Sequence, residues 1–116
     1  MGNLIEDRSF EFAVRIVKLN KYLNEQKKEF VLSKQILRSG TSIGANVAEA
    51  QQGQSDADFV SKMNIALKEA AETKYWLRLL EATEYLTANE TKSILAECIE
   101  LEKILYSIIR TSKSKQ

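Results

Sequence analysis

Apolar residues recur along most of this chain at the three- and four-residue spacing of an amphipathic helix. Over about residues 4–25 the spacing is set by Phe12, Ile16, Leu19 and Leu23. The same spacing in the rest of the chain predicts three further helices, over about residues 29–52, 55–86 and 87–111. Their apolar lines are Leu32, Ile36, Ile43, Val47 and Ala50; then Phe59, Met63, Ala66, Ala70, Thr73, Leu77 and Leu80; then Ile94, Cys98, Leu101, Leu105 and Ile108. The pattern therefore predicts an all-α chain.

The breaks between these segments are short and carry residues that cap helices. Gly53 is placed to end the second helix, and Ser55 with Asp58 resembles a capping box at the start of the third. Thr87 with Glu90 repeats that pattern before the fourth helix. Short links make consecutive helices antiparallel neighbours. We therefore expect residues 1–116 to form a single domain, an antiparallel up-down-up-down four-helix bundle.

Composition supports a globular protein that works away from membranes. Hydrophobic residues make up 44% and charged residues 28%, which allows both a core and a hydrated surface. No apolar run approaches the roughly 18–20 residues of a membrane span, and no secretory signal is visible at the N-terminus. Cys98 is the single cysteine, so no disulfide framework is available. We expect a cytoplasmic protein with no membrane partner.

The residue types that most enzymes need are missing. The chain has no histidine, which excludes Ser-His-Asp and Cys-His nucleophiles and imidazole metal sites. Two carboxylate pairs, Glu69 with Glu72 and Glu97 with Glu100, have the spacing to hold Mg²⁺ or Ca²⁺, but charged outer faces are the simpler interpretation. Cys98 lies on the apolar line of its helix, where a core role is expected. We predict no catalytic residues, no metal and no cofactor.

Small and polar side chains fill the middle of the second predicted helix. Gly40 and Gly44 lie one turn apart beside Ser39, and glycine in a helix interior costs about 1 kcal/mol relative to alanine. This strip predicts close packing against a neighbouring helix or a second subunit, with a kink as a further alternative. Asn46 and Glu49 follow it and predict a paired polar network. The candidate partners of these two residues are Arg38, Lys62, Lys68 and Glu69.

Two aromatic residues lie beside the apolar line of the third predicted helix. Tyr75 and Trp76 have the character of interface anchors, although core packing explains Trp76 equally well. We therefore predict a helix-packing or subunit-interface surface, which comprises Ser39, Gly40, Gly44, Asn46, Glu49, Tyr75 and Trp76.

Charge is unevenly spread although the formal net charge is only +1. Basic side chains outnumber acidic ones in the first 48 residues, which favours either a phosphate-binding surface or ordinary hydrated faces. The candidate nucleic-acid contacts are Arg8, Arg15, Lys18, Lys21, Lys34 and Arg38.

One long stretch resembles a known family. The segment LSKQILRSGTSIGANVAEAQQGQSDADFVSKMNIALKEAAETKYWLRLLE, residues 32–81, resembles the bacterial four-helix-bundle family of 23S rRNA intervening-sequence proteins. Members are encoded in spacer elements inserted in ribosomal RNA genes, and others lie elsewhere in genomes. The family is similar to the accessory protein of diversity-generating retroelements, a basic pentameric barrel that binds nucleic acid and the reverse transcriptase.

What the resemblance implies is a homopentamer without catalytic residues. The net charge of +1 departs from the basic relative, because strong phosphate binding favours a markedly basic surface. The first hypothesis is a non-enzymatic homo-oligomeric interaction module whose partner is a further copy or another protein. The alternative is a nucleic-acid-binding accessory protein that holds ribosomal RNA or DNA on a basic surface of the oligomer.

Overall fold

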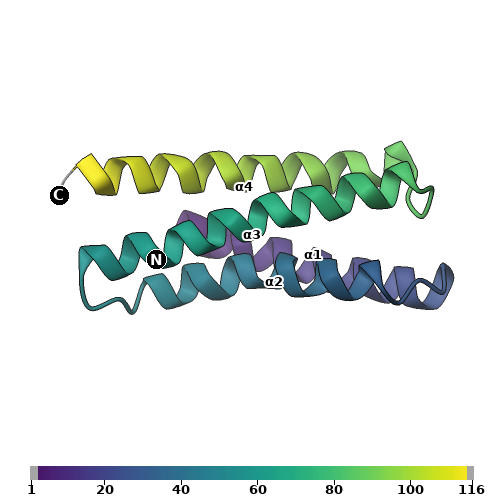
Figure 1. Ribbon diagram of the computed structural model, residues 1–116, viewed down its shortest axis with the longest axis horizontal. Coiled ribbons are helices and arrows are strands. Elements are labelled where there is room, and N and C mark those ends of the chain that lie inside the picture. Colours follow the sequence, from purple (N-terminus) through teal and green to yellow (C-terminus); the bar gives the residue numbers. More distant parts are fainter. Residues whose placement is uncertain (1–2, 115–116) are drawn as a thin grey trace.

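Four long helices make up the computed structural model, which describes residues 3–114. They are α1 (Leu4–Gln26), α2 (Leu32–Ala50), α3 (Asp56–Ala82) and α4 (Ala88–Ser114). Consecutive helices run antiparallel along the 47 Å length of the molecule (Figure 1). The predicted all-α, up-down-up-down bundle is confirmed. Residues 1, 2, 115 and 116 of the predicted domain lie outside the described part.

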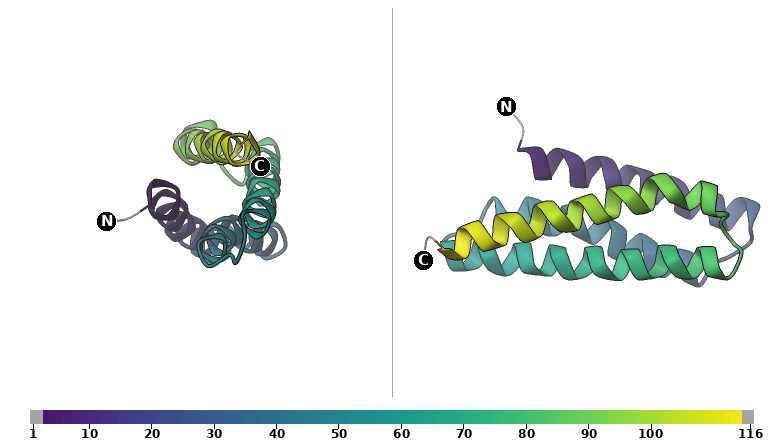
Figure 2. Two further views of the ribbon diagram at one scale, coloured as in Figure 1. Left: turned by 90° about the vertical axis from the view of Figure 1, so that its left-hand side faces the viewer. Right: turned by 90° about the horizontal axis from the view of Figure 1, so that it is seen from above.

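The helices form an incompletely closed square. α2 packs on both α1 and α3, and α3 packs on α4, whereas α1 and α4 touch only sparsely. Viewed along the bundle, α1 and α3 stand on opposite sides, with α2 between them and a gap beside α4 (Figure 2). In the described chain α1 and α3 make no mutual helix contact, so they occupy diagonal corners. None of the helices in residues 3–114 is long and apolar enough to cross a membrane.

The core lies largely where the apolar periodicity places it, although the predicted Leu19, Leu32, Phe59 and Ile108 are only half-buried. Phe12, Ile36, Met63 and Leu105 are fully buried, as are most of the predicted apolar positions. In the last turns of α4 the buried residue is Ile109, while the predicted Ile108 is half-buried. The reason is geometric: Ile109 lies four residues after Leu105 and so continues the row that faces the core.

Two of the predicted helix starts are confirmed in atomic detail. The Ser55 hydroxyl accepts the backbone N–H of Asp58 at 3.1 Å and caps α3. Before α4, Glu90 N–H donates to the Thr87 hydroxyl, and Thr87 N–H donates to the Glu90 carboxylate at 2.8 Å. This reciprocal pair is a complete capping box, and it satisfies two backbone donors that would otherwise lack partners.

The start predicted for the second helix, at about residue 29, is wrong by three residues. The side chain of Glu29 reaches forward to the start of α2 and accepts the backbone N–H groups of Val31, Leu32 and Ser33 at 2.7–3.1 Å. It therefore caps α2 from outside the helix, and this role requires Glu29 itself to be non-helical. The end is also earlier than predicted: Gln51 is the C-cap, and Gly53 does not adopt positive φ.

The third helix ends at Ala82 rather than at the predicted Leu86. Glu84 adopts the left-handed conformation with φ of 67°, and the N–H of Tyr85 reaches back to the carbonyl of Leu80 at 3.0 Å. Helices commonly end at a glycine in this left-handed conformation, and here a glutamate occupies that position. The reversal also turns Leu86 into the core, whereas a continuing helix would direct this residue away from it.

Candidate interaction surfaces

The small-residue strip of α2 lies inside the bundle, against α1. A Cβ on Gly40 would lie 2.6 Å from Cγ1 of Ile16, and one on Gly44 would lie 3.2 Å from the carbonyl oxygen of Ser9. Both glycines therefore let the α1 and α2 backbones approach more closely than side chains would allow. Ser39 is fully buried on the neighbouring face of α2, where its hydroxyl lies 2.9 Å from that of Thr73 on α3.

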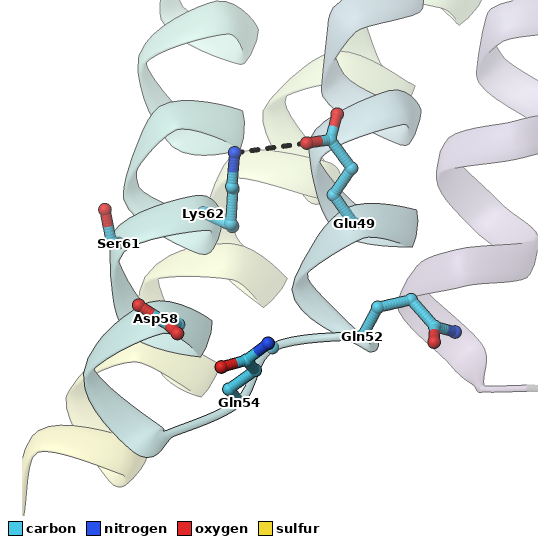
Figure 3. Close-up of a pocket in the computed structure, with 7 residues that line it drawn as sticks. Glu49, Gln52, Gln54, Asp58, Ser61 and Lys62 are labelled. Atoms are coloured by element: carbon cyan, nitrogen blue, oxygen red, sulfur yellow. Dashed lines mark hydrogen bonds and ion pairs between the residues drawn. The ribbon is translucent and has the colours of Figure 1, made fainter.

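The polar residues that follow the strip do not form a buried network. Asn46 is half-buried and donates to the carbonyl of Ser42 in its own helix at 2.8 Å. Glu49 is exposed and pairs with Lys62 of α3 at 3.1 Å, which identifies one of its four candidate partners. That pair forms one wall of an open polar hollow of about 430 Å³ at the α2–α3 connection (Figure 3). The predicted paired network of Asn46 with Glu49 is thus replaced by two separate local contacts.

Tyr75 and Trp76 differ in their surroundings although they are adjacent. Trp76 is half-buried, packs against the core and donates its indole N–H to Glu72 at 3.1 Å. Tyr75 remains 58% exposed, and its ring meets that of Trp76 edge-on, with centroids 5.1 Å apart. Tyr75 is therefore a surface aromatic held in place by a partly buried one.

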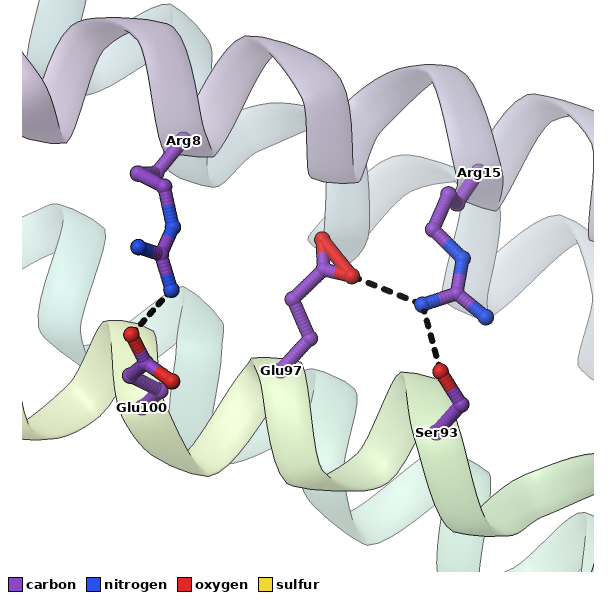
Figure 4. A network of polar contacts seen from close by, with 5 residues as sticks. All are labelled: Arg8, Arg15, Ser93, Glu97 and Glu100. Carbon is purple, nitrogen blue, oxygen red and sulfur yellow. Dashed lines mark hydrogen bonds and ion pairs between the residues drawn. The ribbon is translucent and has the colours of Figure 1, made fainter.

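The six candidate nucleic-acid contacts do not share a common role. Arg8 pairs with Glu100, and Arg15 binds Glu97 at 2.7 Å and Ser93 at 3.1 Å (Figure 4). These contacts connect α1 to α4 across the open side of the bundle and neutralise both arginines locally. The remaining four, which are exposed and distributed over α1 and α2, are Lys18, Lys21, Lys34 and Arg38.

The two carboxylate pairs of the sequence have ordinary surroundings. Glu97 and Glu100 are held by the α1 arginines. Partial burial, followed by the neighbouring Glu72 carboxylate, raises the pKa of Glu69. Within residues 3–114 no three histidine, cysteine, aspartate or glutamate side chains gather as metal ligands would.

Cys98 has the core position that its spacing predicts. The thiol is buried and lies 3.3 Å from the carbonyl oxygen of Ala70. Burial, with the Glu102 carboxylate second, raises its pKa to about 12. A thiol so rarely ionised is a poor nucleophile and a poor metal ligand.

Exposed apolar side chains reveal a feature that the sequence interpretation overlooked. Phe10 is 68% exposed, and Val14 and Val17 follow it at four and three residues on the outer face of α1. Ile65 and Tyr75 are exposed on α3, with the half-buried Leu79 four residues beyond Tyr75. On α1 the signal was readable as a second helical apolar row, whereas on α3 the apolar residues are interrupted by Lys68 and Glu72. The sequence interpretation of α1 rested on the row of Phe12, Ile16, Leu19 and Leu23.

These observations define a four-helix-bundle protein with apolar rows on two outer faces. A model of the 23S rRNA-intervening sequence protein family matches residues 3–107, and the chain belongs to this family. A crystal structure of a protein of unknown function from the S23 ribosomal protein family of Bacteroides thetaiotaomicron VPI-5482 is 62% identical. It superposes with a TM-score of 0.90 over 90% of this chain and 97% of that one. No match is found among curated proteins.

Proposed function

We propose that this protein is a non-enzymatic interaction module that assembles with copies of itself through the outer faces of α1 and α3. The observation that carries the proposal is the exposure of Phe10 and Tyr75, 68% and 58%, on helices at diagonal corners. Rows of apolar side chains left in water are typical of protein interfaces, and aromatic residues are common anchors there.

Two different apolar faces favour a ring over a symmetric dimer. A two-fold dimer uses one self-complementary patch, whereas two unlike patches join head to tail and close when the rotation permits. The resemblance to a pentameric barrel of four-helix bundles supports five copies. On this proposal the chain serves as the repeating wall of an assembly, and another protein binds the assembled ring.

Light scattering coupled to size-exclusion chromatography tests the proposal. At tens of micromolar chain we expect a mass near five times the 13.2 kDa chain. Phe10→Ser and Tyr75→Ser should each reduce that mass while the circular dichroism stays helical. Lys103→Ser, on the exposed surface of α4, is the matched control and should leave the mass unchanged. A wild-type protein that elutes only as a monomer contradicts the proposal.

Nucleic-acid binding is the alternative proposal, and it would use Lys18, Lys21, Lys34 and Arg38. Its support is the exposure of these four cations, repeated in every copy of an oligomer. Arg8 and Arg15 contribute less, because α4 carboxylates already pair with them. Binding of labelled RNA or DNA should weaken steeply between about 50 and 200 mM salt. Absence of binding at the lower concentration eliminates this alternative.

A further inference from the structure

The outer faces of α1 and α3 carry rows with the same internal spacing. The α1 row consists of Asp7, Phe10, Val14, Val17 and Lys21, at intervals of three, four, three and four residues. The α3 row has the identical intervals and consists of Ile65, Lys68, Glu72, Tyr75 and Leu79. Such spacing keeps each row on one side of its helix, as in the seam of a coiled coil.

The contacts inside the bundle fix the relative height of the two rows. Ile16 of α1 faces Gly40, and the adjacent Ser39 bonds to Thr73 of α3. Ile16 and Thr73, 57 positions apart in sequence, therefore lie level along the bundle. Each residue of the α1 row precedes its counterpart in the α3 row by 58 positions, one more than the separation of Ile16 and Thr73. Phe10 is therefore level with Lys68, and Val17 with Tyr75, to within about the 1.5 Å rise of one residue.

The direction of the helices preserves this register between copies. α1 and α3 run the same way, because each is antiparallel to α2 between them (Figure 1). Rotation about an axis parallel to the bundle leaves every residue at its own height. A ring of this kind therefore brings Val17 of one copy opposite Tyr75 of the next. The helices that carry them, α1 and α3, stand on opposite sides of the bundle in the end-on view (Figure 2).

Charges flanking the apolar residues agree with the same register. Asp7 and Glu11 are exposed on either side of Phe10, and Lys68 is exposed at the height of Phe10 on α3. In register, Lys68 of one copy is at a height between Asp7 and Glu11 of its neighbour, where the opposite charges favour the contact. A hollow of about 280 Å³, lined by Tyr75, Arg78, Leu79 and Ala82, lies level with Val17 and Lys21 and offers space for the partner's side chains.

We propose that the α1 row of one copy packs, parallel and in this register, against the α3 row of a second copy. The inference rests on the proposed self-association and specifies its surface and partner. Because the two rows differ, an open chain of copies always has an unpaired α1 row at one end and an unpaired α3 row at the other. Only a closed ring pairs every row.

Cysteine cross-linking tests the pairing directly. Asp7→Cys and Ile65→Cys, which are level in the same register and leave the anchors Phe10 and Tyr75 intact, are made in separate chains with different tags, co-expressed, and treated with a short bismaleimide. We expect two-chain adducts containing one chain of each tag, and a ladder of adducts from the double variant. Lys21→Cys with Ile65→Cys, about four turns out of register, is the matched control and should give none. Wild-type protein, whose buried Cys98 is unreactive, supplies the baseline.

The outcomes separate this inference from the proposed function. If wild-type protein is monomeric by light scattering, self-association itself is wrong. If it is oligomeric but the Asp7–Ile65 pair gives no adduct, self-association stands and the pairing is overturned. Adducts from Asp7→Cys alone would instead indicate a two-fold α1–α1 contact. As a second readout, Lys68→Glu should lower the mass, and adding Glu11→Lys on the same chain should restore it.

Discussion

The Cα of Gly40 faces the side chain of Ile16 so closely that an alanine Cβ would lie within 3 Å of three Ile16 carbons. Ile16 is fully buried, so moving its side chain away from Gly40 would disturb the packing of the core around it. The glycine is therefore a steric requirement of the α1–α2 contact. That requirement explains why a residue costing about 1 kcal/mol in helix propensity occupies the middle of α2.

Gly40→Ala should lower the free energy of unfolding by about 1–3 kcal/mol, because the overpacking outweighs the gain in helix propensity. Gly44→Ala is the control and should cost less, since its Cβ would meet one backbone oxygen at 3.2 Å. Urea unfolding at a single chain concentration measures both. In an Ile16→Ala background the Gly40→Ala cost should largely disappear. A Gly40→Ala protein as stable as wild type would contradict the steric explanation.

Glu84→Gly should stabilise the protein by up to about 1 kcal/mol. Glu84 holds φ of 67°, a conformation that a Cβ disfavours and that glycine adopts without strain. Glu84→Ala keeps the Cβ and should show no such gain. Thermal or urea unfolding of the two variants decides the matter, and equal stabilities would mean that the left-handed residue is not strained.

Glu90 should give the protein an acid-sensitive element of stability. The Thr87 backbone N–H, and then the Tyr22 hydroxyl, hold the pKa of Glu90 below its ordinary value of 4.5. A folded-state pKa below the unfolded one gives stability that is present above pH 4.5 and is lost as the pH falls through the lower value. Glu90→Gln should flatten this part of the stability profile. Side-chain NMR titration showing a Glu90 pKa at or above 4.5 would refute the assignment.

Cys98 should resist thiol reagents until the bundle opens. A pKa of about 12 in place of 9.0 leaves on the order of a thousandfold less thiolate at a given pH, and burial further blocks access. Reaction with a chromogenic disulfide should be slow in buffer and rapid in concentrated urea. Rapid labelling of the native protein would show that α3 and α4 separate readily.

Several features followed from the sequence because they depend on local periodicity. The four helices, most of the core, the Ser55 cap and the Thr87 capping box were all predicted correctly, since each is defined by spacings of three or four residues. Two positions were missed. The Glu29 side chain caps the start of the helix that follows it, and the backbone at Glu84 reverses direction at the end of α3. No residue type signals either event, because glutamate is common in helices.

The candidate interaction surfaces also combine features set by local periodicity with features set by tertiary packing. Sequence periodicity determined that Gly40 and Gly44 share a helix face and that Tyr75 borders the core stripe. Only the tertiary structure decided that the glycines face Ile16 and Ser9, and that α4 carboxylates neutralise Arg8 and Arg15. It also decided that Phe10 and Tyr75 remain in water on opposite sides of the bundle. The reason is that spacing fixes which side chains share a face, whereas the neighbour of that face is set by the packing of all four helices together.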